Sequence, residues 1–374
     1  MLAAALLSSV LLCGCGGGGT GGGSTPSPTP APTPTAAAPT IATSSSNGAQ
    51  NGALIVTLAS ATPGAAVYYT LDGSTPSTSS QQYQAPILVD SNIAINAVAT
   101  VAGSSASSVT SKSFTPSIAS GTLVWSEEFA NSGASNAQPN PATWTYDIGT
   151  NCCGNSELET YCAWASAVSP CNPASPNAYV GTDGYLHIVA QRPTPGAAVY
   201  TSARLKTQGL FSFQYGRVEA RMMLPESQGM WPAFWLLGDN IVTSSWPACG
   251  ELDVMEHIDG SNPQNAGYDW VEGSIHGTSL NGGIQYHPTG FSAAGWHTYG
   301  MIWTKGQIQY YVDSPGNIYA TYTPSTQTGT WPFDTGPEFI LLNLAVGGTW
   351  PGSPDNTTVF PSQMLVDYVR VYSN

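Results

Sequence analysis

Three acidic side chains within six residues are the most chemically suggestive feature of the chain. They occur in the run Gly250-Glu251-Leu252-Asp253-Val254-Met255-Glu256-His257. Side chains of a regular strand alternate between its two faces, so Glu251 and Asp253 share one face and Glu256 points to the other. A one-residue bulge around Val254-Met255 would return Glu256 to the first face. The run therefore predicts three carboxyl groups along one side of a bulged strand.

Such a row of acids could hydrolyse a glycosidic bond. We expect the outer carboxyls to lie about 5–6 Å apart, the separation at which one acts as nucleophile and the other as acid/base, with retention of configuration. Carboxyl groups that close cannot all ionise freely, so at least one has a raised pKa. A solvated acidic strand and a metal cluster are the alternatives. No Lys or Arg in the run offsets the repulsion, and only His257 could add a nearby ligand, so we favour catalysis.

The composition fits a protein that meets a neutral polymer rather than a nucleic acid. The 374 residues include 8 Lys+Arg and 22 Asp+Glu, which gives a net charge of −14, and only 8% of the residues are charged. All the basic residues lie at Lys112 or later and are scattered, so we expect no phosphate-binding stripe and no nucleic acid partner.

The region from 121 to 374 is predicted to be all-β. No stretch of it has helical periodicity with caps, whereas strand-like runs recur between turns that contain Gly and Pro. These runs cover residues 186–190, 216–222, 297–303, 307–312, 339–344 and 364–371. Many strands at short spacing predict a sandwich or jelly roll. Trp125, Trp296 and Trp303 fall in strand-like runs and are expected in the core.

The same region resembles glycoside hydrolase family 16, and within it the laminarinase-like endo-β-1,3-glucanases. The motif Glu-Leu-Asp-Val-Met-Glu matches the family's bulged catalytic strand, and further similar segments lie at 125–129, 216–221, 229–238 and 343–352. The resemblance implies a concanavalin-like jelly-roll sandwich with a cleft on its concave face. It implies that Glu251 is the nucleophile, Glu256 the general acid/base and Asp253 the acid that tunes the nucleophile. No cofactor is expected in catalysis.

Residues for substrate binding are predicted around this strand. A pyranose ring has an apolar C–H face that stacks on an aromatic ring. The candidates for such a wall are Trp231, Trp235, Trp246 and Trp350, with core packing as the alternative for each. His276 corresponds to a cleft His of the family, and Asn155 matches its Gly-Asn-x-Glu-Leu loop. Arg221 could reach the same region or pair with an acid.

The resemblance also implies a structural calcium ion on the convex side, far from the cleft. The matching positions are Glu128 and Gly184, through backbone oxygens, and Asp367. Hard oxygen ligands suit calcium, which would stabilise the fold rather than take part in chemistry. Asp367 could equally be a charge at a strand edge.

The first 39 residues are predicted to be an export signal followed by a linker. Residues 1–15 are an apolar segment that ends in Leu-Cys-Gly-Cys and resembles a lipoprotein signal with a lipobox, although no Lys or Arg precedes it. Cys15 is the expected lipidated residue and Cys13 the weaker candidate; a cleaved signal peptide is the alternative. Residues 16–39 are a linker rich in Gly, Ser, Thr and Pro.

Residues 40–117 are predicted to form a small β-module. Runs at 53–58, 66–70 and 93–99 alternate with period two, and the segment 71–76 supplies a turn. The run Tyr-Tyr-Thr-Leu-Asp-Gly-Ser-Thr-Pro resembles the fibronectin-III-like module that accompanies polysaccharide hydrolases, which implies an Ig/fibronectin-III-like β-sandwich. We favour a spacer; glycan binding through Tyr68 or Tyr69 is the alternative.

Seven cysteines complete the inventory. Without the two in the N-terminal segment, Cys152, Cys153, Cys162, Cys171 and Cys249 remain. Export permits disulfides, and we expect one or two local bridges in the loop from 151 to 171. Five is an odd number, so at least one thiol stays free; Cys249 is the candidate, unless it bonds to that loop.

Together these features predict an exported monomer, lipid-anchored at the bacterial cell envelope or extracellular, that hydrolyses β-glucan as a retaining endo-β-1,3-glucanase. Members of the family that lack the inserted residue of the bulge are mixed-linkage glucanases, so Met255 favours the β-1,3 branch. A mixed-linkage β-1,3-1,4-glucanase and an agarase-type galactan hydrolase are the rival enzymes. A glycan-binding protein without turnover is the rival from another class.

Overall fold

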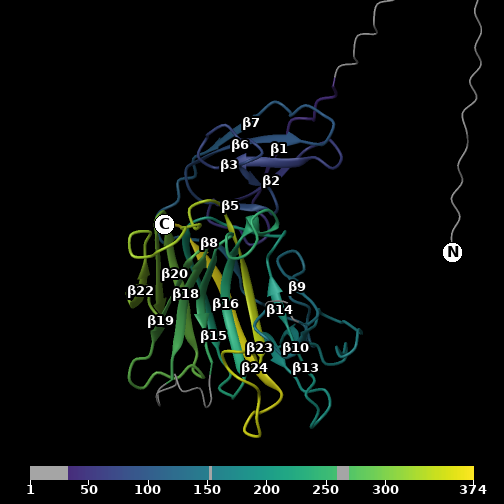
Figure 1. Cartoon of the computed structure of the whole chain (residues 1–374), viewed down its shortest axis with the longest axis vertical. Helices are drawn as coiled ribbons and strands as arrows, with labels where there is room; N and C mark the ends of the chain where they lie inside the picture. Colours follow the sequence, from purple (N-terminus) through teal and green to yellow (C-terminus); the bar gives the residue numbers. More distant parts are fainter. Residues whose placement is uncertain (1–32, 151–153, 259–268) are drawn as a thin grey trace, which may run out of the picture.

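The computed structural model describes residues 33–150, 154–258 and 269–374, and its strands form two β-units in succession (Figure 1). Within these ranges the one helix is the short 3-10 helix η1 (Asp239–Val242). No helix in the described part of the chain has the length and hydropathy needed to span a membrane. The predicted signal segment and most of the predicted linker lie outside the described residues.

The first unit is a sandwich of two small sheets. Its strands are β1 (Thr40–Ser44), β2 (Leu54–Ala59), β3 (Ala66–Thr70), β4 (Gln81–Gln82), β5 (Ile87–Val89), β6 (Ile93–Thr100) and β7 (Thr110–Phe114). They pair in the orders β1-β2-β5 and β4-β3-β6-β7. Alternation holds as predicted, because Val67 and Tyr69 are buried while Tyr68 is half-buried. Tyr69 is therefore a core residue of the module.

The module is fixed to the larger unit by backbone and side-chain contacts. The indole Nε1 of Trp125 donates to the carbonyl of Asn47 at 2.8 Å. Gly48, at φ +83°, lies so close that a Cβ there would be 2.6 Å from that same Nε1. Residue Ser212 also exchanges backbone bonds of 2.9 Å with Pro86 and Leu88. These hydrogen bonds join the module to the second unit.

The second unit is a jelly-roll sandwich. One sheet has seven strands in the order β19-β18-β17-β16-β23-β14-β9: β9 (Thr145–Asp147), β14 (Arg204–Lys206), β16 (Met230–Gly238), β17 (Glu251–Glu256), β18 (Val271–Gly277), β19 (Leu280–Tyr286) and β23 (Glu338–Val346). The other has eight strands, with β8 also pairing β24: β8 (Leu123–Glu127), β11 (Ala178–Val180), β12 (Leu186–Ala190), β15 (Gly216–Met223), β20 (His297–Thr304), β21 (Gln307–Val312), β22 (Ile318–Tyr322) and β24 (Ser362–Tyr372). A short pair, β10 (Glu159–Tyr161) and β13 (Tyr200–Ser202), forms a separate two-stranded sheet. All the strand-like runs predicted in this region are strands.

The core lies between the two large sheets, and period-two alternation decides what faces away from it. On β15, Val218, Ala220 and Met222 are core residues, which turns Arg217 and Arg221 outward. Trp125 and Trp303 are fully buried, as predicted. The prediction for Trp296 is wrong, since its ring lies outside the core, 4.6 Å from the Arg221 guanidinium and 4.8 Å from the Tyr185 ring.

Candidate active site

Strand β17 carries the predicted bulge. Along its border with β16, Met255 pairs with Phe234 but Asp253 pairs with Trp235, so Val254 is one residue more than the partner strand can match. The register along the other neighbour, β18, also shifts between Asp253 and Glu256. The extra residue that the sequence pattern required is therefore present.

The bulge sorts the side chains of β17 into two sets. Leu252, Val254 and Met255 are buried in the core between the sheets. In a regular strand Glu256 would share their side, but the extra residue turns it to the side of Glu251 and Asp253, where all three acids interact electrostatically. We call this side of the seven-stranded sheet, which carries the three acids, the acidic face.

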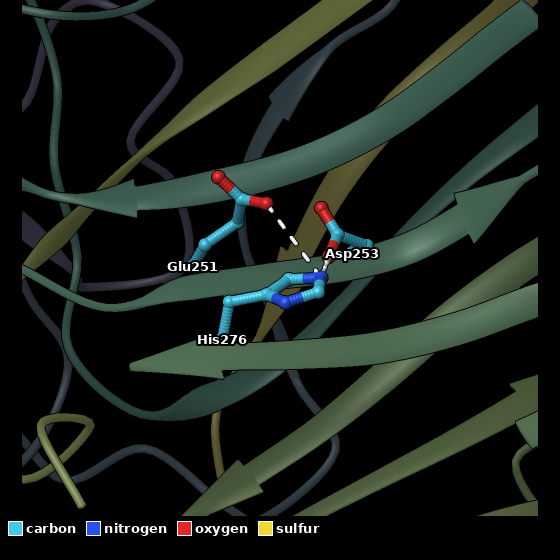
Figure 2. A group of neighbouring side chains, drawn as sticks. All are labelled: Glu251, Asp253 and His276. Atoms are coloured by element: carbon cyan, nitrogen blue, oxygen red, sulfur yellow. Dashed lines mark ion pairs between the residues drawn. The ribbon is translucent and has the colours of Figure 1, made fainter. Parts of the chain in front are cut away.

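The three acids are linked through two residues of β18. His276 Nε2 lies 3.2 Å from Asp253 Oδ2 and 3.8 Å from Glu251 Oε1 (Figure 2). The Ser274 hydroxyl donates to Asp253 Oδ2 at 2.7 Å and lies 3.2 Å from Glu256 Oε2. A continuous polar chain thus runs from one outer carboxyl to the other, with the buried Asp253 at its centre.

His276 supplies the positive charge of this chain. Burial alone would lower its pKa, but the hydrogen bond to Asp253 and the charges of the neighbouring acids outweigh burial and raise the pKa to about 9. The ring is therefore protonated at neutral pH and donates to Asp253. Glu251, Asp253 and His276 are also the only group of three potential ligands that the described residues bring together. His276 Nε2 already contacts Asp253 at 3.2 Å, so we favour the catalytic interpretation.

Burial separates the two outer carboxyls into unlike groups. It raises the pKa of Glu251, followed by repulsion from Asp253, while His276, Arg204 and a hydrogen bond from Trp246 act against the rise. Burial also raises the pKa of Glu256, and both other acids repel its charge. Glu251, with His276 and Arg204 to favour its charged form, is the better placed of the two to ionise, and Glu256, repelled by both acids, is the better placed to hold a proton.

Two of the predicted tryptophans stand beside the acid that keeps its proton. Trp231 Nε1 donates to Glu256 Oε1 at 2.9 Å, and its ring meets that of Trp350 edge to face at 5.3 Å. Trp270, buried, continues this row at 5.7 Å from Trp350. The row forms an aromatic border at the Glu256 end of the site.

Trp235 lies further along β16, the strand that also carries Trp231, and pairs with Asp253 of β17. Its Nε1 donates to Asn343 Oδ1 at 2.7 Å, and the Arg204 guanidinium lies 4.4 Å from its ring. Arg204 also acts electrostatically on Glu251. The sequence analysis missed Arg204, Asn343 and Ser274. Their positions within strands β14, β23 and β18 were the only signal that could have identified them.

The remaining predicted positions lie at the edges of the site. Trp246 is 57% exposed and hydrogen-bonds Glu251 from the loop before β17. Asn155 accepts from the backbone N–H of Thr349 at 2.9 Å. A Cβ on Gly348 would lie 3.2 Å from the Asn155 carbonyl and 3.5 Å from the Trp231 ring, so that loop packs beside the aromatic border. The structure therefore brings Trp231, Trp235, Trp246, Trp350, His276 and Asn155 to the acidic face.

The arrangement of two unlike carboxyls on a bulged strand is that of a glycosidase, and known proteins agree. Residues 174–370, more than half of the chain, match the model of glycosyl hydrolases family 16. The chain belongs to this family. Residues 45–111 match the chitobiase/beta-hexosaminidase C-terminal domain, a fibronectin-III-like module, as predicted.

Relatives of this family 16 enzyme include well-covered glucanases. A beta-glucanase of Rhodothermus marinus is 39% identical over 267 residues, which are 67% of this chain and 84% of that protein. The laminarinase catalytic domain of Thermotoga maritima MSB8 superposes with a TM-score of 0.56 at 34% identity, over 68% of this chain and 99% of that one. The endo-beta-1,3-glucanase of Pyrococcus furiosus gives 0.55 at 38% identity, over 67% and 94%.

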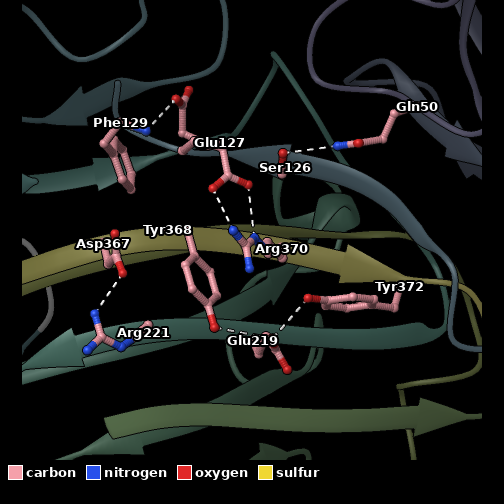
Figure 3. A network of polar contacts seen from close by, with 11 residues as sticks. Gln50, Ser126, Glu127, Phe129, Glu219, Arg221, Asp367, Tyr368, Arg370 and Tyr372 are labelled. Carbon is pink, nitrogen blue, oxygen red and sulfur yellow. Dashed lines mark hydrogen bonds and ion pairs between the residues drawn. The ribbon is translucent and has the colours of Figure 1, made fainter. Parts of the chain in front are cut away.

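Arg221, one of the residues predicted to bind substrate, does not lie on the acidic face. Arg221 lies on β15, in the eight-stranded sheet, and its Nη1 donates to Asp367 Oδ2 at 2.7 Å (Figure 3). Its neighbours Ala220 and Met222 point into the core, so Arg221 points away from the acidic face. The prediction that it binds substrate there is wrong, and the alternative, pairing with an acid, is what the structure shows.

The calcium positions lie around β24 and stay a prediction. Asp367 gives one oxygen to Arg221, and no described residue donates to its Oδ1. The Glu128 carboxylate forms a two-pronged pair with Arg370 at 2.8 and 2.9 Å, so its backbone oxygen is what it could offer. Gly184 occupies a turn at φ +83°. One free carboxylate oxygen with backbone carbonyls is a donor set that fits calcium.

The cysteines follow the predicted pattern where the structure describes them. Cys162 and Cys171 form a disulfide, which confirms one local bridge. Cys249 is a buried free thiol two residues before Glu251. Burial first, and then nearby carboxylates, raise its pKa to about 12, so it is an unreactive thiol. Cys152 and Cys153 lie outside the described residues.

Proposed function

We propose that the protein is a retaining endo-β-1,3-glucanase that cleaves β-glucan by double displacement. The bulge of β17 carries the proposal, because it places Glu256 beside Glu251 and Asp253 instead of in the core. Two carboxyls of unlike proton affinity flanking one bond are what retention requires. The relatives that share most of this domain include a beta-glucanase and two enzymes described as laminarinase or endo-beta-1,3-glucanase.

In this proposal each acid has one role. Glu256 protonates the glycosidic oxygen while Glu251 attacks the anomeric carbon, which forms a glycosyl-enzyme and releases the leaving sugar. Glu256 then takes a proton from water, which attacks the same carbon and frees Glu251. Asp253, held by Ser274 and His276, lies next to the nucleophile and fixes its orientation.

The aromatic residues of the acidic face are proposed to stack on the sugar rings. Trp231 and Trp350 border the Glu256 end, Trp235 lies four residues after Trp231 on β16 and opposite Asp253, and Trp246 is exposed beside Glu251. Asn155 would add a polar contact from its loop. Residues that hold pyranose rings at both ends of the row of acids suit cleavage within a chain.

The discriminating experiment compares laminarin, lichenan and agarose as substrates. We expect reducing ends chiefly from laminarin, and proton NMR should show that the first product has the β configuration. Preferred cleavage of lichenan or agarose would assign the rival enzyme activities. Binding without any cleavage would contradict the enzymatic proposal altogether.

The role of Glu251 has its own test. Glu251→Ala should abolish hydrolysis, and azide should restore turnover with an inverted glycosyl azide, because the small anion takes the place of the missing carboxylate. Hydrolysis at the wild-type rate in this variant would remove Glu251 from its role.

We further propose that the enzyme is exported and tethered to the cell envelope through a lipid on Cys15, with residues 16–39 as the tether, 40–117 as the module and 121–374 as the catalytic domain. The Leu-Cys-Gly-Cys sequence and the following low-complexity segment support this. Cys15→Ser should move the protein from the membrane fraction to the soluble fraction, whereas Cys13→Ser should not.

A further inference from the structure

Ser274 lies between two of the three acids, and its contact with Glu256 has no role in the chemistry proposed so far. It lies directly across from Asp253 in the register of β18 and β17 and is 2% exposed. Its Oγ is 2.7 Å from Asp253 Oδ2 and 3.2 Å from Glu256 Oε2. One hydroxyl can reach both acids only because the bulge between them turns Glu256 to this face.

We propose that Ser274 is a positioning residue that holds the proton of Glu256 on Oε2. Its effect on turnover rests on the function proposed above, whereas its effect on the proton does not. A hydroxyl has a single proton to donate, so it cannot donate to two carboxyls at once. The shorter contact to Asp253, which also lies 3.2 Å from the His276 ring, marks Asp253 as the acceptor of that proton.

The lone pairs of Ser274 are then left for Glu256. A protonated Glu256 donates from Oε2 to Ser274 Oγ, while an ionised Glu256 would set its negative oxygen against those lone pairs. The other oxygen, Oε1, accepts from Trp231 Nε1 at 2.9 Å. The two oxygens of Glu256 thus have different roles. Oε1 accepts the hydrogen bond from Trp231, and Oε2 carries the proton and donates it to the Ser274 hydroxyl.

The backbone around Ser274 is anchored from the opposite sheet. The buried hydroxyl of Tyr310, on β21, donates to the Ser274 carbonyl at 2.7 Å. The hydroxyl of Tyr322, on β22, donates to the Gly273 carbonyl at 3.0 Å. Two hydrogen bonds from the core therefore hold this part of β18 in place, which gives the Ser274 hydroxyl the precision that a positioning role needs.

The titration of Glu256 tests the proposal directly. Infrared difference spectra between each protein and its Glu256→Gln counterpart follow the protonated carboxyl without any substrate. Ser274→Ala should shift the midpoint of Glu256 to lower pH by about one unit, because the protonated form loses its acceptor. Ser274→Thr keeps the hydroxyl and should restore the midpoint. Trp231→Phe should shift it to higher pH, since the ionised form loses a donor.

Kinetics on laminarin provide the second readout. Ser274→Ala should lower kcat about tenfold with KM within about twofold, and Ser274→Thr should recover most of it. If the alanine variant fails to fold, Ser274→Cys replaces it with the same expected shift, since a thiol is a weak acceptor.

The outcomes separate this inference from the function. A midpoint that is unchanged or raised in folded Ser274→Ala overturns the role of Ser274, even if laminarin is hydrolysed normally. A lowered midpoint of Glu256 in Ser274→Ala supports the role of Ser274. If the wild-type protein at the same time hydrolyses neither laminarin, lichenan nor agarose, the proposed function is overturned instead.

Discussion

The two large sheets of the catalytic domain carry acids in opposite surroundings. On the face of the eight-stranded sheet that points away from the core, here called the ion-pair face, three acids each meet an arginine: Glu219 with Arg217, Glu128 with Arg370, and Asp367 with Arg221 (Figure 3). On the acidic face Glu251 and Asp253 share the ring of His276 (Figure 2), and both of these acids repel the charge of Glu256. Paired acids stabilise a fold, whereas crowded acids with too few partners cost stability and keep raised pKa values for chemistry.

Glu219 shows how completely a structural acid is satisfied. Besides Arg217, it accepts from the hydroxyls of Tyr311 at 2.5 Å, Tyr372 at 3.1 Å and Tyr368 at 3.4 Å. Glu256, by contrast, has the Trp231 indole and the Ser274 hydroxyl and sits among repelling charges. Burial alone therefore does not distinguish the two kinds of acid, but the number of their donors does.

The largest expected effect follows from removing an acid of each kind. Glu256→Gln should lower kcat on laminarin by about 10³-fold, because the leaving oxygen loses its proton donor. Glu219→Gln should leave kcat within about twofold. Initial rates with each variant, at equal folded concentration, measure the contrast.

A substrate with a good leaving group sharpens this prediction. In the dinitrophenyl β-glycoside of laminaribiose the leaving group, dinitrophenolate, departs without being protonated. The Glu256→Gln variant should therefore still release dinitrophenolate in a rapid first step. A variant equally slow on both substrates would show that Glu256 supports the fold and not proton transfer, and the contrast between the faces would fail.

The sequence predicted the acidic face better than the ion-pair face, and the reason is local. The acids of the motif lie within six residues of one strand, so period two and one bulge were enough to place them. Arg221 and Asp367 are 146 residues apart, and only the pairing of β15 with β24 brings them together. Alternation predicted that Arg221 would face one side of a strand but could not tell which sheet that strand would join.

The same limit explains the residues that were missed. Ser274, Arg204 and Asn343 reach the site from β18, β14 and β23, whose order in the sheet is not the order in the chain. His276 was found through the family resemblance, but Ser274, two residues earlier on the same face, carried no signal of its own. The strands themselves were predictable, because the alternation of apolar and polar side chains that marks a strand can be read within its own residues.

His276 decides how easily the acidic face ionises. His276→Gln removes the positive charge beside Glu251, so the pKa of Glu251 should rise. Activity at low pH is lost when Glu251 takes up a proton, and the acid limb of the kcat profile should therefore move to higher pH by about one unit. An acid limb that stays in place, or moves to lower pH, would show that His276 does not tune the nucleophile.

Removing charge from the ion-pair face should affect stability instead of rate. Glu219→Gln leaves Arg217 without its partner in a half-buried site and should lower the free energy of unfolding by about 2 kcal/mol. Guanidinium titration followed by tryptophan fluorescence measures the change. Glu251→Gln should lower the free energy of unfolding little or raise it, because it relieves the repulsion between Glu251 and the neighbouring acids. Equal losses of stability at Glu219 and Glu251 would contradict the difference between the two faces.

The smallest expected effect concerns calcium on the ion-pair face. If Asp367 binds the ion through the oxygen that Arg221 leaves free, saturating calcium should raise the Tm by about 5 °C over the chelated protein, as expected when a ligand binds only the folded state. Asp367→Ala should abolish this difference, and kcat at 25 °C should not respond to chelation, since the site lies on the other sheet from Glu251. A Tm that ignores calcium would leave Asp367 as the partner of Arg221 alone, and a kcat that falls with chelation would show that the two faces are not independent.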